Sequence, residues 1–220
     1  MRISGARTLM LVFSAALVFV SCQKELDDPT ITPGNGGGGT GGGGGTGNTS
    51  IIGDWNFVGM VAHTKSTVTV SQQGLNMKAI TTSDYISQNN TGTVNITATK
   101  FTSTNLAYSI DTIMNLKTYI DGVLLDDSDL PFVLDSPPSS SVTDYTRNNT
   151  DSLTFASSFF GASGPTGGPT QTGPVGARIS WSGDTLLLRV KSSFTQTITQ
   201  QGVPATMDAS VDGTMKLKRR

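Results

Sequence analysis

Cysteine and histidine, which carry much of enzyme chemistry, each occur once in this chain, as Cys22 and His63. A metal site built from several histidines is therefore excluded, and any Ser-His-Asp arrangement would depend on His63 alone. The sequence contains no G-x-S-x-G, H-E-x-x-H or phosphate-loop motif. We therefore expect no catalytic residues, no cofactor and no enzymatic activity, and we interpret His63 as an ordinary strand residue.

Two acidic segments offer the oxygen ligands that calcium prefers. The first is Asp126–Asp129, which we interpret as a solvated turn. The second, Asp208–Gly213, resembles the opening of an EF-hand loop, but Arg219 stands where the bidentate glutamate belongs. Because apolar residues alternate there, we expect a strand, and we expect no metal site in either segment.

Cys22 ends a segment with the three-part pattern of a secretory signal. Arg2 and Arg7 give a positive start, an apolar stretch covers residues 8–20, and the small Ser21 precedes the cysteine. The stretch is shorter than the roughly 20 apolar residues that span a bilayer. A free thiol is a liability on an exported protein, so the position favours a cysteine that becomes modified.

The segment Phe19-Val20-Ser21-Cys22 resembles the lipobox of bacterial lipoproteins, with Phe19 in place of the usual leucine. The resemblance implies that residues 1–21 are removed and that Cys22 carries acyl chains such as palmitate. The next segment, Gln23–Asp28, resembles the signal that sends Bacteroidota lipoproteins to the outer face of the outer membrane. We therefore expect a lipid-anchored protein facing the cell exterior; the alternatives are a periplasm-facing anchor and an ordinary cleaved signal.

Residues 22–50 are expected to form a flexible tether, and residues 51–220 one folded domain. Of the 26 glycines, 11 lie between Gly34 and Gly47, where few side chains are available to offset the entropy cost of ordering. Removal of Arg2 and Arg7 leaves 13 basic residues (15 − 2) against 16 acidic ones. This negative balance argues against a nucleic-acid partner.

Apolar residues at alternate positions predict β-strands through most of residues 51–220. The clearest runs are Trp55-Phe57-Gly59-Val61, Val68-Val70, Val94-Ile96-Ala98, Ile179-Trp181, Leu186-Leu188-Val190 and Met207-Ala209-Val211. Asp121-Gly122 and Ser182-Gly183-Asp184 separate such runs and predict hairpin turns. We expect an antiparallel up-and-down β-barrel of about eight to ten strands, because closure removes exposed edges. The alternative is an immunoglobulin-like sandwich.

The domain opens with Gly53-Asp54-Trp55, a G-x-W strand, and ends with Asp212–Lys218. Together with the hairpins, these features resemble the lipocalin-like (calycin) domains of many Bacteroidota lipoproteins. The resemblance implies that Trp55 packs across the barrel floor. It also implies that a basic residue from a late strand, Arg189 or Lys216, lies over the indole.

The segment Gly161–Gly176 carries six glycines and three of the nine prolines, a composition that predicts a loop. It follows Phe155, Phe159 and Phe160. We interpret these aromatic residues as part of the core and the loop as a surface insertion. The alternative is a lid over an open barrel end.

Three tripeptides resemble the Asp-Ser/Thr-apolar sequon for O-glycosylation of exported Bacteroidota proteins. They are centred on Thr112, Ser152 and Thr185, each preceded by aspartate. The resemblance implies modification at these three hydroxyls.

Two functions are consistent with the sequence. The first is a binding module for a small apolar or amphiphilic ligand, which requires a concave apolar pocket with a few polar groups. The second is a structural or accessory subunit with a filled barrel, which contacts another surface protein or a glycan. Trp55 and Trp181 are expected to point inward, so that ligand entry would change their fluorescence.

Cys22→Ser should abolish acylation and leave the protein soluble or unprocessed, because the serine hydroxyl does not replace the thiol as acyl acceptor. Labelling with a radioactive fatty acid measures this directly. Equal label in the wild type and the variant would contradict the lipobox assignment.

Overall fold

The computed structural model describes residues 50–157, 173–200 and 202–220. The expected signal and acylation site, the tether up to residue 49 and most of the glycine-rich loop lie outside this range. Regular structure within it consists of β-strands. It contains no helix long and apolar enough to cross a membrane.

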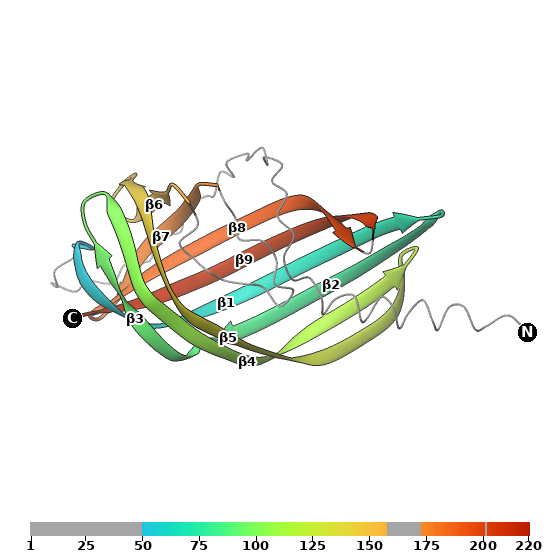
Figure 1. The fold of residues 1–220 in the computed structure, drawn as a ribbon, viewed down its shortest axis with the longest axis horizontal. Helices are drawn as coiled ribbons and strands as arrows, with labels where there is room; N and C mark the ends of the chain where they lie inside the picture. The colour runs from blue at the N-terminus through green and yellow to red at the C-terminus, as the bar shows by residue number, and fades with distance from the viewer. Residues whose placement is uncertain (1–49, 158–172, 201) are drawn as a thin grey trace, which may run out of the picture.

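Nine strands form one antiparallel sheet, which runs the length of the molecule (Figure 1). They are β1 (Gly53–Gln72), β2 (Leu75–Ile86), β3 (Gln88–Ile96), β4 (Lys100–Ile120), β5 (Val123–Arg147), β6 (Ser152–Phe155), β7 (Val175–Ser182), β8 (Thr185–Gln200) and β9 (Val203–Arg219). Because β1 also pairs with β9, the sheet closes into a ring. The predicted all-β, barrel-like fold is confirmed, and the two-sheet sandwich is not formed. Both predicted hairpin turns are present.

Strands β2 and β3 act as one strand that is broken at Ser87. Both run antiparallel to β1 and to β4, with the same edge of β1 facing each in turn. At the break, the Met60 amide donates to Ser87 Oγ at 2.7 Å, and the Ser87 amide donates back to the Met60 carbonyl at 2.9 Å. Ser87 Oγ in turn donates to Asn90 Oδ1 at 2.6 Å. The break is therefore an ordered kink with its polar groups satisfied.

Opposite this kink, β1 carries a β-bulge at Gly59. The register with β9 shifts between Phe57 and Gly59, and Gly59 has a φ of +148°. One extra residue reverses which side chains face inward. The expectation that Val61 shares a face with Trp55 is therefore wrong: Met60 and Ala62 are buried, whereas Val61 lies on the outer face and is 36% exposed.

The ring has two parts, which we call the closed half and the open half. In the closed half, β6 and β7 bridge from residues 145–147 of β5 to residues 185–190 of β8. In the open half, residues 123–143 of β5 and 191–200 of β8 each pair with a described strand on one edge only. The open half therefore consists of the strands β8, β9, β1, β2, β4 and β5, in that order.

Aromatic and aliphatic side chains fill the closed half. Phe155 packs edge-on against Phe101, with ring centroids 5.5 Å apart, and against Tyr145 at 5.8 Å. Leu186, Leu188, Leu217, Ile96 and Val94 are also almost fully buried. The assignment of Phe155 to the core is confirmed, whereas Phe159 and Phe160 lie outside the described residues. The loop predicted to end at Gly176 ends earlier, because β7 begins at Val175.

Trp55 lies at the base of this core and is fully buried. Its Nε1 donates to the Ile51 carbonyl at 3.0 Å. The cation over its ring is Arg219, with Cζ 4.8 Å from the ring centroid. The prediction that Arg189 or Lys216 takes this place is wrong. Arg189 lies two residues before Lys191, and Lys216 lies two residues before Lys218. Side chains two residues apart on a strand share a face, and both of these lysines point outward, so Arg189 and Lys216 point away from the core.

Gly92→Ala should lower the free energy of unfolding by about 2 kcal/mol or more, because overpacking and a disfavoured φ add together. Gly92 has a φ of +104°, and a Cβ there would lie 2.5 Å from the Asn105 carbonyl oxygen. Gly176→Ala is the matched control, since nothing lies within 4 Å of its Cβ position. Denaturant titration measures both; equal losses would contradict this account of Gly92.

Candidate ligand-binding face

The inner face of the open half is lined by side chains in four regular rows. Each row crosses β8, β9, β1, β2 and β4, and successive rows are two residues apart, about 6.6 to 6.8 Å. From the closed half outward, the rows are Ser192-Val211-Thr64-Ser83-Met114, Phe194-Ala209-Ser66-Thr81-Leu116, Gln196-Met207-Val68-Ala79-Thr118 and Ile198-Ala205-Val70-Met77-Ile120. On β5, Leu130, Ser128 and Asp126 continue the first three rows.

These rows contain no ionisable side chain on the five strands that they cross. The charged residues of the same stretches alternate with the rows and lie on the outer face: His63, Lys65, Lys78, Asp84, Lys117, Lys191, Asp208 and Asp212. Asp126 of β5 is the one carboxylate at the edge of the rows. The inner face therefore presents an uncharged surface of apolar and hydroxyl groups.

Polarity changes along the rows. The outermost row is apolar throughout, and Val68, Val70, Ala205 and Met207 form a buried cluster of their own, distinct from the core of the closed half. The two rows nearest the closed half instead carry the buried hydroxyls of Thr64, Ser66, Thr81 and Ser83. The open half thus has an apolar outer zone and a polar, uncharged inner zone.

Four buried hydroxyls have no hydrogen-bond partner among the described residues. Those of Ser66, Ser83 and Thr118 lie in the rows, whereas Tyr85 belongs to the core of the closed half. Ser83 is 2% exposed and Ser66 is 7% exposed. Burial raises the pKa of Tyr85, and its neighbour Tyr108 raises that pKa further. A buried polar group without a partner costs about 1–3 kcal/mol of stability. The sheet therefore keeps hydroxyls here at the expense of stability.

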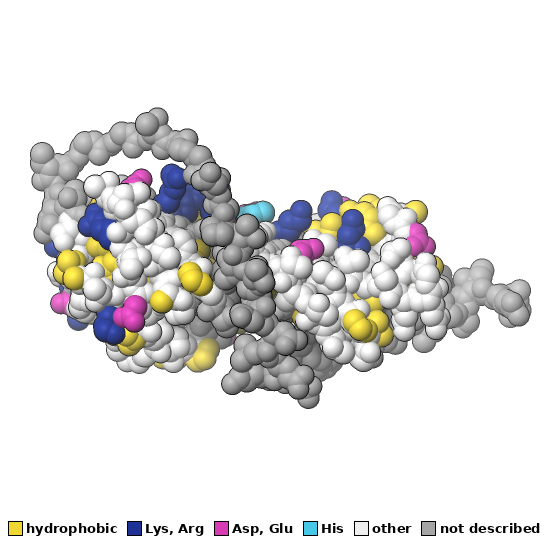
Figure 2. Space-filling model, turned by 90° about the horizontal axis from the view of Figure 1, so that it is seen from above, with side chains coloured by type: hydrophobic (Ala, Val, Ile, Leu, Met, Phe, Trp, Pro, Cys, Tyr) yellow, Lys and Arg dark blue, Asp and Glu magenta, His cyan; other side chains and the backbone are white. Residues whose placement is uncertain are grey.

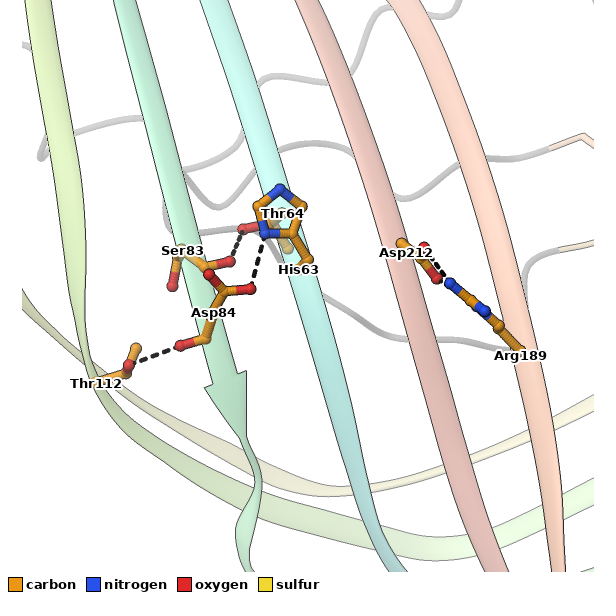
Figure 3. Close-up of polar contacts among 7 residues, drawn as sticks. All are labelled: His63, Thr64, Ser83, Asp84, Thr112, Arg189 and Asp212. Carbon is orange, nitrogen blue, oxygen red and sulfur yellow. Dashed lines mark hydrogen bonds and ion pairs between the residues drawn. The ribbon is translucent and has the colours of Figure 1, made fainter.

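The outer face of the same strands carries ion pairs instead (Figure 3). His63 Nδ1 lies 2.8 Å from Asp84 Oδ1, and Arg189 holds Asp212 with two hydrogen bonds of 2.8 and 2.7 Å. The Arg189 hydrogen bond, with that of Lys191, lowers the pKa of Asp212 to about 2. Because the His63 and Arg189 side chains are about half exposed, these pairs contribute little to stability.

The two acidic segments both lie in strands. Asp126–Asp129 belongs to β5, so the predicted turn is wrong. Asn115 Nδ2 donates to the carboxylates of Asp127 and Asp129, and Lys117 forms an ion pair with Asp127. Because side chains alternate along a strand, Asp126 points to the inner face and Asp127 to the outer face, so their two carboxylates lie on opposite sides of the sheet. Asp208–Gly213 lies in β9, as predicted. Within the described ranges, no three His, Cys, Asp or Glu side chains gather as a metal site would require.

The three predicted glycosylation hydroxyls lie on different strands. Thr112 is on β4, where its Oγ1 donates to the Asp84 carbonyl at 2.8 Å. Ser152 starts β6 and donates to Asn149 Oδ1 at 3.0 Å, and Thr185 starts β8. Each is half-buried. Modification at these positions stays a prediction.

Apolar side chains also reach the surface at the hairpin turns of the open half. Leu75 follows one turn, and Val123, Leu124 and Leu125 follow another; all are exposed. The Asn76 amide donates to Asp121 Oδ1, and the Asp121 amide donates to the Asn76 carbonyl, so hydrogen bonds join the two turns. Figure 2 shows hydrophobic and basic side chains close together at the surface towards this end.

Both tryptophans point inward, as predicted, but they lie in the closed half. Their ring centroids are 5.8 Å apart. Trp55 pairs with Arg219, eight residues along β9 from the first row at Val211. That separation is about 27 Å, so indole fluorescence reports on the packed core rather than on the inner face of the open half.

Sequence reasoning missed the hydroxyl rows because it followed apolar alternation alone. Thr64 and Ser66 continue the same two-residue period as Val68 and Val70. The available signal was that hydroxyl residues take alternate positions of a strand whose other inward positions are apolar. Comparison with known proteins finds no family model, no curated protein and no solved structure that matches the chain.

Tyr85→Phe and Thr118→Val should each raise the free energy of unfolding by about 1 kcal/mol, because each removes an unsatisfied hydroxyl and keeps the shape of the side chain. Tyr145→Phe is the control: its hydroxyl donates to the Thr97 carbonyl at 2.6 Å, so its loss should destabilise. Denaturant midpoints decide the sign. A destabilised Tyr85→Phe would mean that this hydroxyl already has a partner.

Proposed function

We propose that this chain is a lipid-anchored surface protein whose open half binds an elongated, neutral, apolar or amphiphilic ligand along its inner face. The observation that carries the proposal is the uncharged lining of the four rows, which combines apolar side chains with buried hydroxyls. Such a mixture is typical of small-molecule sites, where apolar contacts give affinity and a few polar groups fix orientation.

The position of the site follows from packing. Large side chains occupy the closed half, whereas the inner rows of the open half include Ala79, Ala205 and Ala209. We therefore place the ligand in the open half and assign the closed half the part of a rigid base.

The anchor and the cell-surface location rest on the sequence. The lipobox-like segment ending at Cys22 and the charged segment after it support export and acylation. A lipid-anchored protein at the cell surface is well placed to take up amphiphiles. Resemblance to lipocalin-like domains supports the same class of function.

A second function, an accessory subunit that contacts another surface protein, is favoured by one observation. Val61, Ile86, Ile113 and Val133 are exposed on the outer face, on neighbouring strands. Exposed apolar patches often mark protein interfaces. Under this alternative, substitutions on the inner rows leave function unchanged.

Diphenylhexatriene, a hydrocarbon that fluoresces in apolar surroundings, should bind the mature chain, residues 22–220, expressed without the signal segment and with Cys22→Ser so that no acyl chains compete. Ile198→Lys should weaken this binding at least tenfold, about 1.4 kcal/mol, because the bound hydrocarbon would cover an ammonium that has no partner. Ile198 is half-buried, so the variant is expected to fold, and thermal melting checks this.

Thr197→Lys is the matched control, one residue away on the outer face. It adds the same charge and should change the affinity less than twofold. Equal losses in the two variants, or no binding to the wild type, would contradict the proposed site.

A further inference from the structure

We infer that the hydroxyl belt, defined as Ser66, Ser83 and Thr118, binds the carbonyl groups of a neutral ester- or amide-linked lipid. This inference rests on the proposed function and specifies the chemistry of its ligand. The belt occupies three neighbouring strands, with Ser66 on β1, Ser83 on β2 and Thr118 on β4.

The three hydroxyls are buried and lack a partner among the described residues. Each carries an O–H that needs an acceptor, and each lies where water has little access. An acceptor supplied by a ligand would recover the hydrogen bond that folding leaves unmade. The belt is therefore prepared for a group rich in acceptors.

The charges around the belt determine which acceptor suits it. No cationic side chain occupies the four inner rows on the strands that they cross, and the one inward carboxylate, Asp126, is at their edge beside Thr118. An anionic phosphate or carboxylate would be buried there without a counter-charge, which is costly. Asp126 repels it further. An uncharged carbonyl avoids both penalties.

The length of the belt and its flanks determine the rest of the ligand. Along β2, Ser83 lies four residues from Ala79, the register partner of Thr118, which is about 14 Å. That length fits several carbonyls better than one. On the outer side, Val70, Met77 and Ile198 provide apolar contacts for a hydrocarbon chain. The geometry points to an acylated molecule with its linkage at the belt and a chain towards the rim.

Displacement of diphenylhexatriene by methyl decanoate tests this inference in the mature chain with Cys22→Ser. In the double variant Ser66→Ala/Ser83→Ala, the concentration of methyl decanoate needed for half displacement should rise at least tenfold, after correction for probe affinity. The affinity of the hydrocarbon probe itself should change less than twofold. Comparing one ligand across variants cancels differences in water solubility.

Ser193→Ala/Ser210→Ala is the matched control, because these serines pair across β8 and β9 on the outer face. It should leave both affinities unchanged. Thr118→Val is a second test variant that preserves the shape of the side chain. It should also weaken the binding of methyl decanoate.

Three results would overturn the inference. If methyl decanoate binds the inner-face variants as it binds the wild type, the hydroxyls do not contact the linkage, and the proposed function stands. If the variants lose affinity for the ester and for the probe by the same factor, the hydroxyls support the fold rather than bind the ligand. If the wild type binds no probe, the proposed function fails, and the inference fails with it.

Discussion

The fold depends on β1, which pairs with β3 and then β2 along one edge and with β9 along the other. One strand of 20 residues thus belongs to both halves of the ring. Its bulge at Gly59 lies next to the break at Ser87, where the Met60 amide donates to the serine hydroxyl. The bulge changes which residues of β1 face inward: Trp55 and Phe57 before it, and Met60, Ala62 and Thr64 after it.

The two halves of the ring contribute differently to the stability of the fold. In the closed half, aromatic rings contact one another and Trp55 is enclosed by Ile51, Trp181 and Arg219. In the open half, buried hydroxyls without partners lower stability. Proteins tolerate such local costs at functional sites when the rest of the fold is well packed. This contrast is the physical basis for assigning binding to the open half.

An open sheet has exposed edges, and such edges invite pairing with other chains. The edge strand β5 carries Pro131, Pro137 and Pro138, which lack the amide that a neighbouring strand needs. Asp127 and Asp129 add charge on the same strand. On the opposite edge, β8 is rich in threonine, and Lys191 begins the stretch that pairs with a described strand on one edge only. These features allow the sheet to stay open over part of its length.

Alternation and turn chemistry are local, and they predicted most of the strands, the turns at Asp121-Gly122 and Gly183-Asp184, and the inward faces of the late strands. Val61 faces outward for a reason that lies in the folded sheet, since the bulge that turns it depends on a hydrogen bond between residues 27 apart. Likewise, Arg219 rather than Arg189 covers Trp55 because the end of β9 meets the start of β1. The hydroxyl belt also joins three strands through their register. Register between distant strands is set by the whole packed sheet, so local patterns do not contain it.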